Sequence, residues 1–392
     1  MKSIPQSPPL GRSALRSVTV ASAMAVALAS PALAQSVFDS ELRLAPQFMQ
    51  YHIGFPNDET VSELAIPVYV SMPISSSFTL DIGTAYTRAH VASGSLTSDV
   101  SGLTDTQVRG NLTLGADFIV LTAGLNLPTG KSQVTAEQFA AAGRIANDFL
   151  AFPITSLGTG FGGTLGLAVA RPLGEWNVGF GAAVRRSAGY EPFNIPGQEL
   201  HFQPGNEYRA RVGLDRGIGG GRLSLGLTYS AFGNDAAGGF AYNTGDRVIT
   251  QAVYSTTLGG SDVTFAGYDV LRSSGTLASG APSGRENIAN LFASIGLQRL
   301  GTVITPSIEL RHDLQQYPAT TNGVTTTDGY SQGSYLATLG LRTHADVGGI
   351  MLFPSAGFTL GNLAVPGSSG PTHASLQGFR AQVAARFTPF GQ

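Results

Sequence analysis

The chain has 392 residues, 23 basic and 25 acidic side chains, 51 glycines and no cysteine. Charged residues make up 12% of it, about half the ~25% of an ordinary soluble domain, while 42% of residues are hydrophobic. This composition excludes a disordered tail and a polybasic nucleic-acid-binding protein, and the absence of cysteine excludes a disulfide scaffold, thiol catalysis and Cys-ligated zinc.

Residues 1–34 have the pattern of a cleaved signal peptide. Basic residues at its start precede the apolar run Val18–Ala29, a helix-breaking Pro31 and an A-x-A cleavage site at Ala32–Ala34. The apolar run is too short to cross a ~30 Å hydrocarbon core. No later stretch reaches the ~18 apolar residues of a transmembrane helix, so residues 35–392 can span a membrane only as a closed β-barrel.

Residues 35–392 read as antiparallel strands. In Phe78–Arg88 and Glu207–Asp215, apolar and polar residues alternate with a period of two, which is typical of strands between two different environments. Short and long connections alternate along the chain. Short turns are expected at 73–77, 116–117, 172–175, 216–221, 259–262, 300–301 and 346–349, and long loops at 54–60, 92–105, 129–158, 188–203, 233–246, 273–286, 315–329 and 361–372.

These connections join sixteen strands. An even number of strands, with short periplasmic turns and long extracellular loops, is typical of a single transmembrane antiparallel barrel of the bacterial outer membrane. Fourteen strands is the alternative number, and a soluble all-β sandwich or propeller is the alternative fold. Phe78, Phe118 and Trp176 follow short turns and Phe387 closes the last strand, so we expect these rings at the periplasmic membrane interface.

The longest connection, residues 129–158, is the third long loop. Thr135–Gln138 resembles a capping box, and Ala136–Leu150 is rich in alanine and compatible with a helix. In the 16-stranded general porins, which this layout resembles, the third loop folds inward and narrows the lumen. That resemblance implies an inward fold here, and a loop packed on the rim is the alternative. The candidate constriction residues are Glu137, Phe139, Arg144, Asp148 and Phe149.

Many arginines lie on the polar side of the predicted strands. Each would cost ~2–4 kcal/mol near the middle of the lipid, so we expect them in the lumen. The candidate pore-lining residues are Arg43, Arg109, Arg171, Arg185, Arg209, Arg211, Arg311, Arg380, Glu207 and Glu309. They either select solutes by charge or form ion pairs that hold the wall. The near balance of acidic and basic residues predicts weak ion selectivity.

Catalysis has little support in the sequence. The six histidines are scattered without metal-ligand spacing, and no G-x-S-x-G motif is present. We therefore expect no catalytic residue, no metal site, no cofactor and no enzyme activity.

One stretch resembles a known family. Gly124–Lys131 reads GLNLPTGK and is followed by GTG at Gly158–Gly160 and by LGEW at Leu173–Trp176. This order resembles the outer-membrane transporters of the MetA-pathway phenol-degradation family and, distantly, the barrels that import fatty acids and aromatic hydrocarbons. The resemblance covers about Gly124–Tyr190 and implies a barrel that takes up small, often hydrophobic compounds.

The sequence therefore predicts an outer-membrane channel of a Gram-negative bacterium that gives passive passage to small molecules, narrowed by residues 129–158. Its expected partners are the lipid bilayer and small solutes, with no nucleic acid, and the layout is compatible with a homotrimer. One alternative is a dedicated uptake channel for hydrophobic or aromatic compounds, with an apolar path formed by Phe139, Ile145, Phe149, Leu150, Phe152 and Phe161. Another is a structural or surface-interaction barrel with a closed lumen.

Overall fold

The computed structural model describes residues 41–387, apart from 56–57, 116–117, 198, 300–301, 322–323 and 366–371, and apart from the side chains of 299 and 319–330. The predicted signal peptide, residues 1–34, lies outside the described residues. No helix among the described residues has the length and apolar character needed to cross a membrane.

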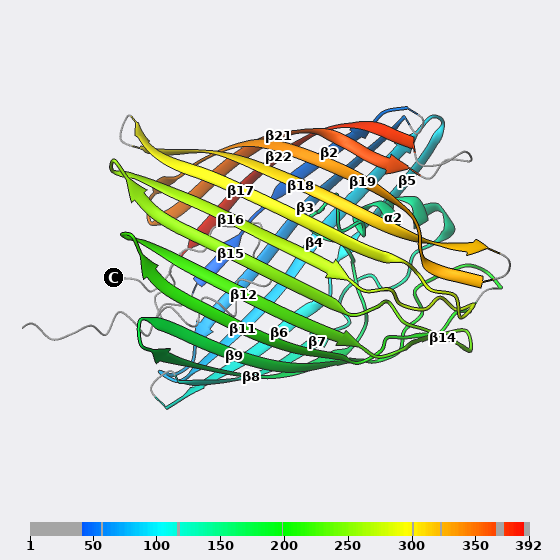
Figure 1. Ribbon diagram of the computed structural model, residues 1–392, viewed down its shortest axis with the longest axis horizontal. Coiled ribbons are helices and arrows are strands. Elements are labelled where there is room, and N and C mark those ends of the chain that lie inside the picture. The colour runs from blue at the N-terminus through cyan, green and yellow to red at the C-terminus, as the bar shows by residue number, and fades with distance from the viewer. Residues whose placement is uncertain are drawn as a thin grey trace, which may run out of the picture.

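Sixteen antiparallel strands close into one barrel, as predicted (Figure 1). In ring order they are β1 (Glu41–Leu44) continued by β2 (Gln47–Ile53), β3 (Glu59–Pro73), β4 (Phe78–Ser93), β5 (Leu96–Leu103) continued by β6 (Thr106–Leu114), β7 (Ile119–Leu127), β8 (Gly162–Leu173), β9 (Trp176–Ser187), β11 (Glu207–Ile218), β12 (Gly221–Phe232), β15 (Arg247–Leu258), β16 (Ser261–Arg272), β17 (Arg285–Arg299), β18 (Thr302–Thr321), β19 (Val324–Thr343) continued by β20 (Ala345–Val347), β21 (Ile350–Val365) and β22 (Thr372–Phe387). The ring closes because β22 pairs with β21 on one side and with β1 and β2 on the other.

The expected alternation of short and long connections fails at two places, because two of the expected long loops are largely strand. The segment 92–105 turns at Ser93–Leu96 and returns as β5, which pairs with β4 out to Tyr86↔Leu103. The segment 315–329 belongs to β18 and β19, whose ladder continues to Thr321↔Val324. Residues 92–105 are rich in serine and threonine, and residues 315–329 are rich in threonine. Threonine and valine favour strands, so their polar composition was misread as loop.

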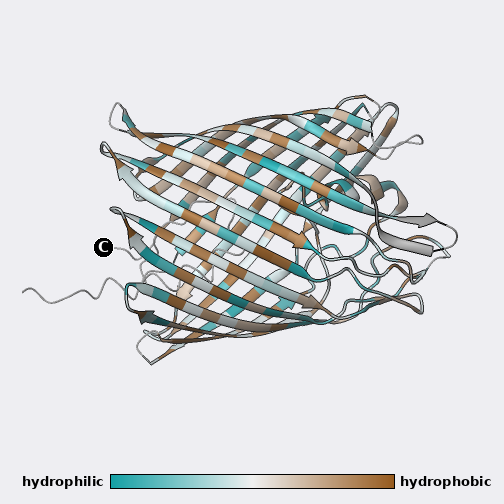
Figure 2. Ribbon diagram, in the orientation of Figure 1, coloured by the Kyte–Doolittle hydropathy of each residue, from teal (hydrophilic) through white to brown (hydrophobic). Residues whose placement is uncertain are grey.

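Hydrophobic and hydrophilic residues alternate along the strands (Figure 2), and this alternation separates an apolar outer face from a more polar inner face. In β8 the exposed side chains of Leu165, Leu167 and Leu173 share the outer face. Gly166 and Ala168 lie between them on the inner face and pair with Ala183 and Gly181 of β9. Other strands repeat this outer apolar surface, for example with Phe265, Leu339 and Leu360, each more than half exposed. Such a surface fits the hydrocarbon region of a bilayer.

The remaining elements belong to the connections at the long-loop end. A small three-stranded sheet consists of β10 (Phe202–Gln203), β13 (Asp235–Ala237) and β14 (Phe240–Tyr242). The third long connection contains a 3₁₀ turn, η2 (Ala136–Gln138), and a helix, α2 (Phe139–Ile145). Figure 1 shows α2 at this end of the barrel, opposite the end with the short turns.

The helix is shorter than the predicted Ala136–Leu150. Its start agrees with the capping-box pattern, since the Thr135 N–H donates to the Gln138 side chain at 3.2 Å. Its end is set by Asn147, whose side-chain oxygen accepts the backbone N–H groups of Phe149 and Leu150 at 3.0 and 3.1 Å. Such local hydrogen bonds compete with the helix and end it.

Candidate functional site

The base of the third loop is fastened by one carboxylate. Asp105, between β5 and β6, accepts the N–H of Gly130 at 3.1 Å, where the loop leaves the wall. It also accepts the N–H of Thr159 at 2.7 Å, where the loop returns, and the amide of Asn126 at 2.8 Å. Asp105 is buried. The LPTG and GTG motifs therefore form a neck that holds both ends of residues 129–158, here called the lumen segment.

Glycine is required in this neck by close backbone contact. A Cβ atom on Gly130 would lie 2.2 Å from the carbonyl oxygen of Leu157 and 2.5 Å from the backbone nitrogen of Asp105. Distances under 3.0 Å require backbone movement. A Cβ on Gly158 would be 3.1 Å from the Asp105 carboxylate. The two ends of the lumen segment can approach each other in the neck only because these positions have no side chain.

Beyond the neck, the helix α2 is bound to the wall strands β3 and β5. Ser98 of β5 donates to the carbonyl of Glu137 and accepts the N–H of Ala141 at 3.1 Å. Arg144 makes two hydrogen bonds to Glu59 of β3, from Nε to Oε1 at 2.7 Å and from Nη2 to Oε2 at 2.6 Å. Paired guanidinium–carboxylate bonds of this kind fix orientation as well as distance.

After α2 the lumen segment crosses the interior of the ring. Asp148 pairs with Arg272 of β16 at 3.0 Å and with Arg247 of β15 at 3.7 Å. The strands β3 and β16 are separated by β4 to β15 in one direction around the ring and by β17 to β22, β1 and β2 in the other. A segment that contacts both of these distant walls within a few residues, through Arg144 and Asp148, lies inside the barrel.

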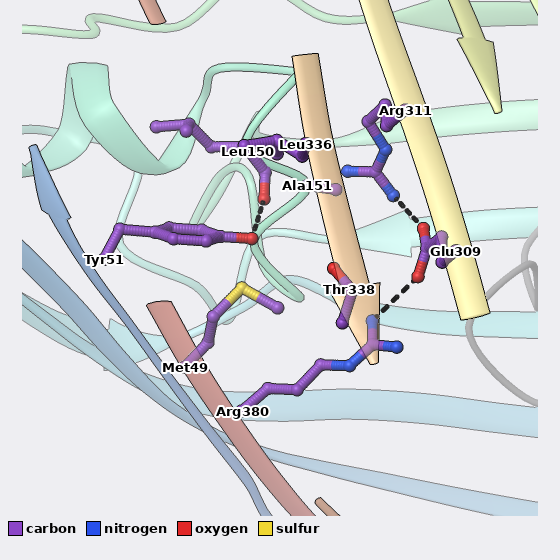
Figure 3. Close-up of a pocket in the computed structure, with 9 residues that line it drawn as sticks. All are labelled: Met49, Tyr51, Leu150, Ala151, Glu309, Arg311, Leu336, Thr338 and Arg380. Carbon is purple, nitrogen blue, oxygen red and sulfur yellow. Dashed lines mark hydrogen bonds and ion pairs between the residues drawn. The ribbon is translucent and has the colours of Figure 1, made fainter. Parts of the chain in front are cut away.

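Phe149 and Leu150, here called the tip of the lumen segment, contact the wall through their backbone carbonyls. The contact of Leu150 is drawn in Figure 3. Arg311 of β18 donates to the Phe149 carbonyl at 2.9 Å, and the Tyr51 hydroxyl of β2 donates to the Leu150 carbonyl at 3.1 Å. Glu309 neutralises Arg311 at 2.7 Å and Arg380 at 3.1 Å. The cavity among these groups has a volume of about 20 Å³, which is room for roughly one water molecule. The tip therefore packs closely against β2, β18, β19 and β22 at this place.

Apolar packing extends this contact over one half of the lumen. Buried residues of the lumen segment include Ile145, Phe149, Leu150 and Phe152, and the Phe152 ring meets the Tyr51 ring edge-on with centroids 5.5 Å apart. They belong to one cluster with inward-facing wall residues. These are Tyr51, Ile53, Val61, Ala89, Val91, Val100, Ile288, Leu336, Leu363, Ala374 and Leu376. The wall members come from β2 to β5 and from β17 to β22, so the barrel has an internal hydrophobic core against these strands.

The other half of the wall, from β7 to β12, presents small side chains to the lumen. Here called the open sector, it carries inward-facing Gly124, Gly166, Gly179, Gly181 and Gly213. The nearest atoms that a Cβ on any of these would meet belong to β6 to β12, and none belongs to the lumen segment. By contrast, a Cβ on Gly102, between β4 and the neck, would meet the side chains of Lys131 and Leu157 at 3.1 and 3.3 Å. The lumen segment thus covers one half of the wall and leaves the open sector uncovered.

Strand register gives the face of each candidate pore-lining residue. Nine of them lie on the inner face: Arg43, Arg109, Arg185, Arg209, Arg211, Arg311, Arg380, Glu207 and Glu309. Arg171 differs from the expectation, because it shares the outer face of β8 with Leu167 and Leu173. Its guanidinium lies over the Phe118 ring, 4.0 Å from the centroid, next to a short turn. At the end of a strand an outward arginine costs only about 0–1 kcal/mol, so the lipid argument did not apply to it.

Phe118 and Trp176 lie at the short-turn end, as expected from the sequence. The guanidinium of Arg216 lies 5.4 Å from the Trp176 ring centroid, which repeats the pairing of Arg171 with Phe118. Two arginine–aromatic pairs thus lie next to the short turns.

The candidate constriction residues have different surroundings. Arg144 and Asp148 hold the lumen segment to the wall, and Phe149 is buried in the internal core. Glu137 and Phe139 are exposed. The Thr135 hydroxyl donates to Glu137 at 2.6 Å, which holds the pKa of that carboxyl below its usual value. Phe139 stacks on Phe193 of the next long connection, with centroids 5.0 Å apart.

The apolar path expected for hydrophobic solutes is mostly filled. Ile145, Phe149, Leu150 and Phe152 are at most 3% exposed, because they pack in the internal core and do not line a passage. Of the six residues in that expectation, Phe139 and Phe161 are exposed, at 48% and 50%. Among the described residues no cluster of histidine and acidic side chains could hold a metal ion.

Sequence reasoning missed several residues that fix the lumen segment. Asp105, Glu59 and Tyr51 hold its neck, helix and tip, and buried Glu63 accepts the N–H of Ile154 at 3.2 Å. The LPTG and GTG motifs were a signal for the neck, but nothing in the sequence identified the carboxylate that joins them.

Comparisons with known proteins found similar solved structures at low sequence identity. No family model and no curated protein matches the chain. Among solved structures, a bacterial polysaccharide outer membrane secretin is 11% identical, with 89% of this chain and 99% of that chain covered and a TM-score of 0.46. The outer membrane protein OpdK (OccK1) of Pseudomonas aeruginosa is 9% identical over 89% and 98%, with a TM-score of 0.46. An outer membrane channel from Pseudomonas putida F1 is 13% identical over 90% and 97%, with a TM-score of 0.37. The function proposed below therefore rests on the geometry of the lumen.

Proposed function

We propose that the protein is an outer-membrane channel through which small molecules diffuse along the open sector, beside the lumen segment. The chain is exported, loses residues 1–34 and inserts with its short turns in the periplasm and its long connections outside. A ring of about sixteen strands is too wide for its own side chains to fill, so it encloses a water-filled space unless another segment occupies it.

One observation carries this proposal: the lumen segment packs against β2 to β5 and β15 to β22 but leaves the open sector uncovered. Among the described residues, no hydrogen bond or ion pair joins it to the inner faces of β9, β11 or β12. The passage is therefore a one-sided gap that excludes large solutes by size. Binding in it is weak, since a conducted solute must leave as well as enter.

Planar-bilayer recording of the purified protein tests this function. We expect steady ohmic steps, and a larger conductance when Ala136–Leu150 is deleted. A heat-modifiable band in gel electrophoresis verifies that the deletion variant still forms a barrel. Absence of current together with saturable uptake of an aromatic compound would favour the dedicated uptake channel. Absence of both current and uptake would favour the structural barrel.

Thiol labelling locates the passage, because the chain has no cysteine of its own. Gly181→Cys places a thiol in the open sector, where the new Cβ meets nothing closer than 3.6 Å. Leu336→Cys is the matched control, because Leu336 also faces inward but is only 4% exposed, in the internal core near the tip. We expect a charged thiol reagent to reduce the current of the first variant and to leave the second unlabelled. Equal labelling of both would contradict a one-sided gap.

A further inference from the structure

Two arginines of the open sector have no acidic partner among the described residues. Arg185 of β9 and Arg211 of β11 face the lumen on neighbouring strands, where Arg185 is opposite Glu207 and Arg211 is opposite Gly181 in register. Glu207 is engaged by Arg209, whose Nη2 lies 2.5 Å from its carboxylate. Lower on the same wall, Arg222 is engaged by Asp215 at 2.7 Å. Among the described residues, neither Arg185 nor Arg211 therefore forms an ion pair.

The surrounding wall has an excess of positive charge. Arg209 donates to Ser230 of β12, which is opposite Arg247 of β15 in register, and Arg247 is opposite Arg272 of β16. The long-loop half of β9 to β16 thus carries the inward-facing guanidinium groups of Arg185, Arg209, Arg211, Arg247 and Arg272. The carboxylates that face them are Glu207, Asp148 of the lumen segment and Glu286 of β17. Even with Asp313 of β18, which lies near Asp148 and Glu286, five positive charges against four negative charges leave this side of the gap positive.

The wall beside these arginines allows a solute to come close. Gly181 of β9 is opposite Arg211 and four residues before Arg185, and the nearest atoms that a Cβ there would meet are the Leu167 carbonyl and the Cβ atoms of Ala168 and Arg211 at 3.6–4.0 Å. Arg185 is exposed and on the inner face, and among the described residues no hydrogen bond or ion pair joins the lumen segment to it or to Arg211. A planar guanidinium binds a carboxylate through two parallel N–H bonds, and it binds best where no other acid competes.

We propose that Arg185 and Arg211 form an anion-binding position in the open sector and that the gap prefers small carboxylates over cations. This inference rests on the proposed function and departs from the weak ion selectivity expected from the overall composition. Composition counts all charges, whereas the structure pairs most of them and leaves two arginines free at the gap. Fixed positive charges along a narrow passage favour anions.

Reversal potentials in a KCl gradient across a planar bilayer test the preference. We expect chloride-selective current from the wild-type protein and a reversal potential that moves toward zero in R185Q/R211Q, with benzoate replacing chloride as a second anion. The control is R186Q, because Arg186 is the next residue of β9 and faces outward; its reversal potential should equal that of the wild type. Cation-selective wild-type current, or no change in R185Q/R211Q, would overturn the inference and leave the channel intact.

Binding measured without current separates the two proposals. Calorimetric titration of benzoate into the full chain in detergent should show saturable binding that R185Q/R211Q loses and R186Q keeps. If the bilayer shows no current, the proposed channel function is wrong. Binding that is lost in R185Q/R211Q and kept in R186Q would still support the anion-binding position. Absence of binding in the wild type would overturn it.

Discussion

Arg144 and Glu59 join the helix of the lumen segment to the wall through two parallel hydrogen bonds of 2.7 and 2.6 Å. The Glu59 side chain is 6% exposed and that of Arg144 is 33% exposed, so the pair is partly shielded from water. A shielded pair of this geometry contributes more to orientation than an exposed one. Together with Asp148–Arg272, it holds the two ends of the crossing in place.

Loss of this pair should loosen the lumen segment. In Glu59→Gln the Arg144 guanidinium loses its charged partner. We expect the attachment of the lumen segment to the wall to weaken by about 2 kcal/mol, which raises the population of the detached segment roughly 30-fold. Hydrogen exchange of the α2 amides measures this as faster exchange. The matched control is Glu175→Gln, which removes an ion pair to Arg216 at the short-turn end, where Glu175 is 74% exposed. Equal effects of the two changes would contradict the role given to Glu59.

The neck should open when Asp105 loses its charge. Asp105→Asn replaces one accepting oxygen by an NH₂ group that faces the donors Gly130, Thr159 and Asn126. We expect a cost of about 2 kcal/mol in local stability. Lys131, next to the neck, is the only lysine after residue 34, so a lysine-specific protease reports the opening as one faster cut. Asp99→Asn, at a half-exposed site on β5, should leave the cleavage rate unchanged.

Two glycines of the lumen segment should respond oppositely to alanine. Gly130→Ala forces a Cβ against backbone atoms at 2.2 and 2.5 Å, so we expect a lower unfolding temperature and a displaced neck. Gly143, in α2, has nothing within 4 Å of a new Cβ. Gly143→Ala should stabilise the helix by up to ~1 kcal/mol through its higher helix propensity. Thermal unfolding in detergent measures both, and a stable Gly130→Ala protein would refute the packing described for the neck.

Adjacent residues near the middle of β8 test the assignment of the two faces. Leu167 is 45% exposed on the outer face, and Leu167→Arg should cost about 2–4 kcal/mol of folding free energy in a bilayer. Ala168 faces the lumen in the open sector, opposite Gly181. Ala168→Arg should therefore cost much less folding free energy and should reduce the conductance of the channel. Urea titration of folding into lipid vesicles gives both free energies. A reversed order would mean that the faces are exchanged.

The sequence predicted the number of wall strands and most of the inward side chains, because one rule governs them, but it missed the strands within 92–105 and 315–329. The two-residue period places Arg209 and Arg211 on the inner face without knowledge of any contact. The same rule, applied along β8 through Leu165 and Leu167, would have placed Arg171 outside. The cost of burying charge in lipid was used there instead, and that cost vanishes at a strand end where a guanidinium can lie over Phe118.

The interior could be predicted only in part, because it depends on contacts between distant positions. The capping pattern at Thr135–Gln138 is local, and it marks the start of the helix. The end of α2 depends on Asn147, and the crossing depends on Asp148 meeting Arg272, which lies more than a hundred residues along the chain. Phe149 was a constriction candidate because it lies in the third long loop, but only the packing against wall strands such as β17 and β22 shows that it is buried.

The internal core also has a consequence for assembly of the barrel. Its wall members come from the first strands, β2 to β5, and from the last, β17 to β22, and these two groups meet where β22 pairs with β1 and β2. The lumen segment therefore bridges the seam between the beginning and the end of the chain. Before the seam forms, neither group of strands can bury its inward apolar side chains alone, so docking of the segment and joining of the terminal strands become one cooperative step.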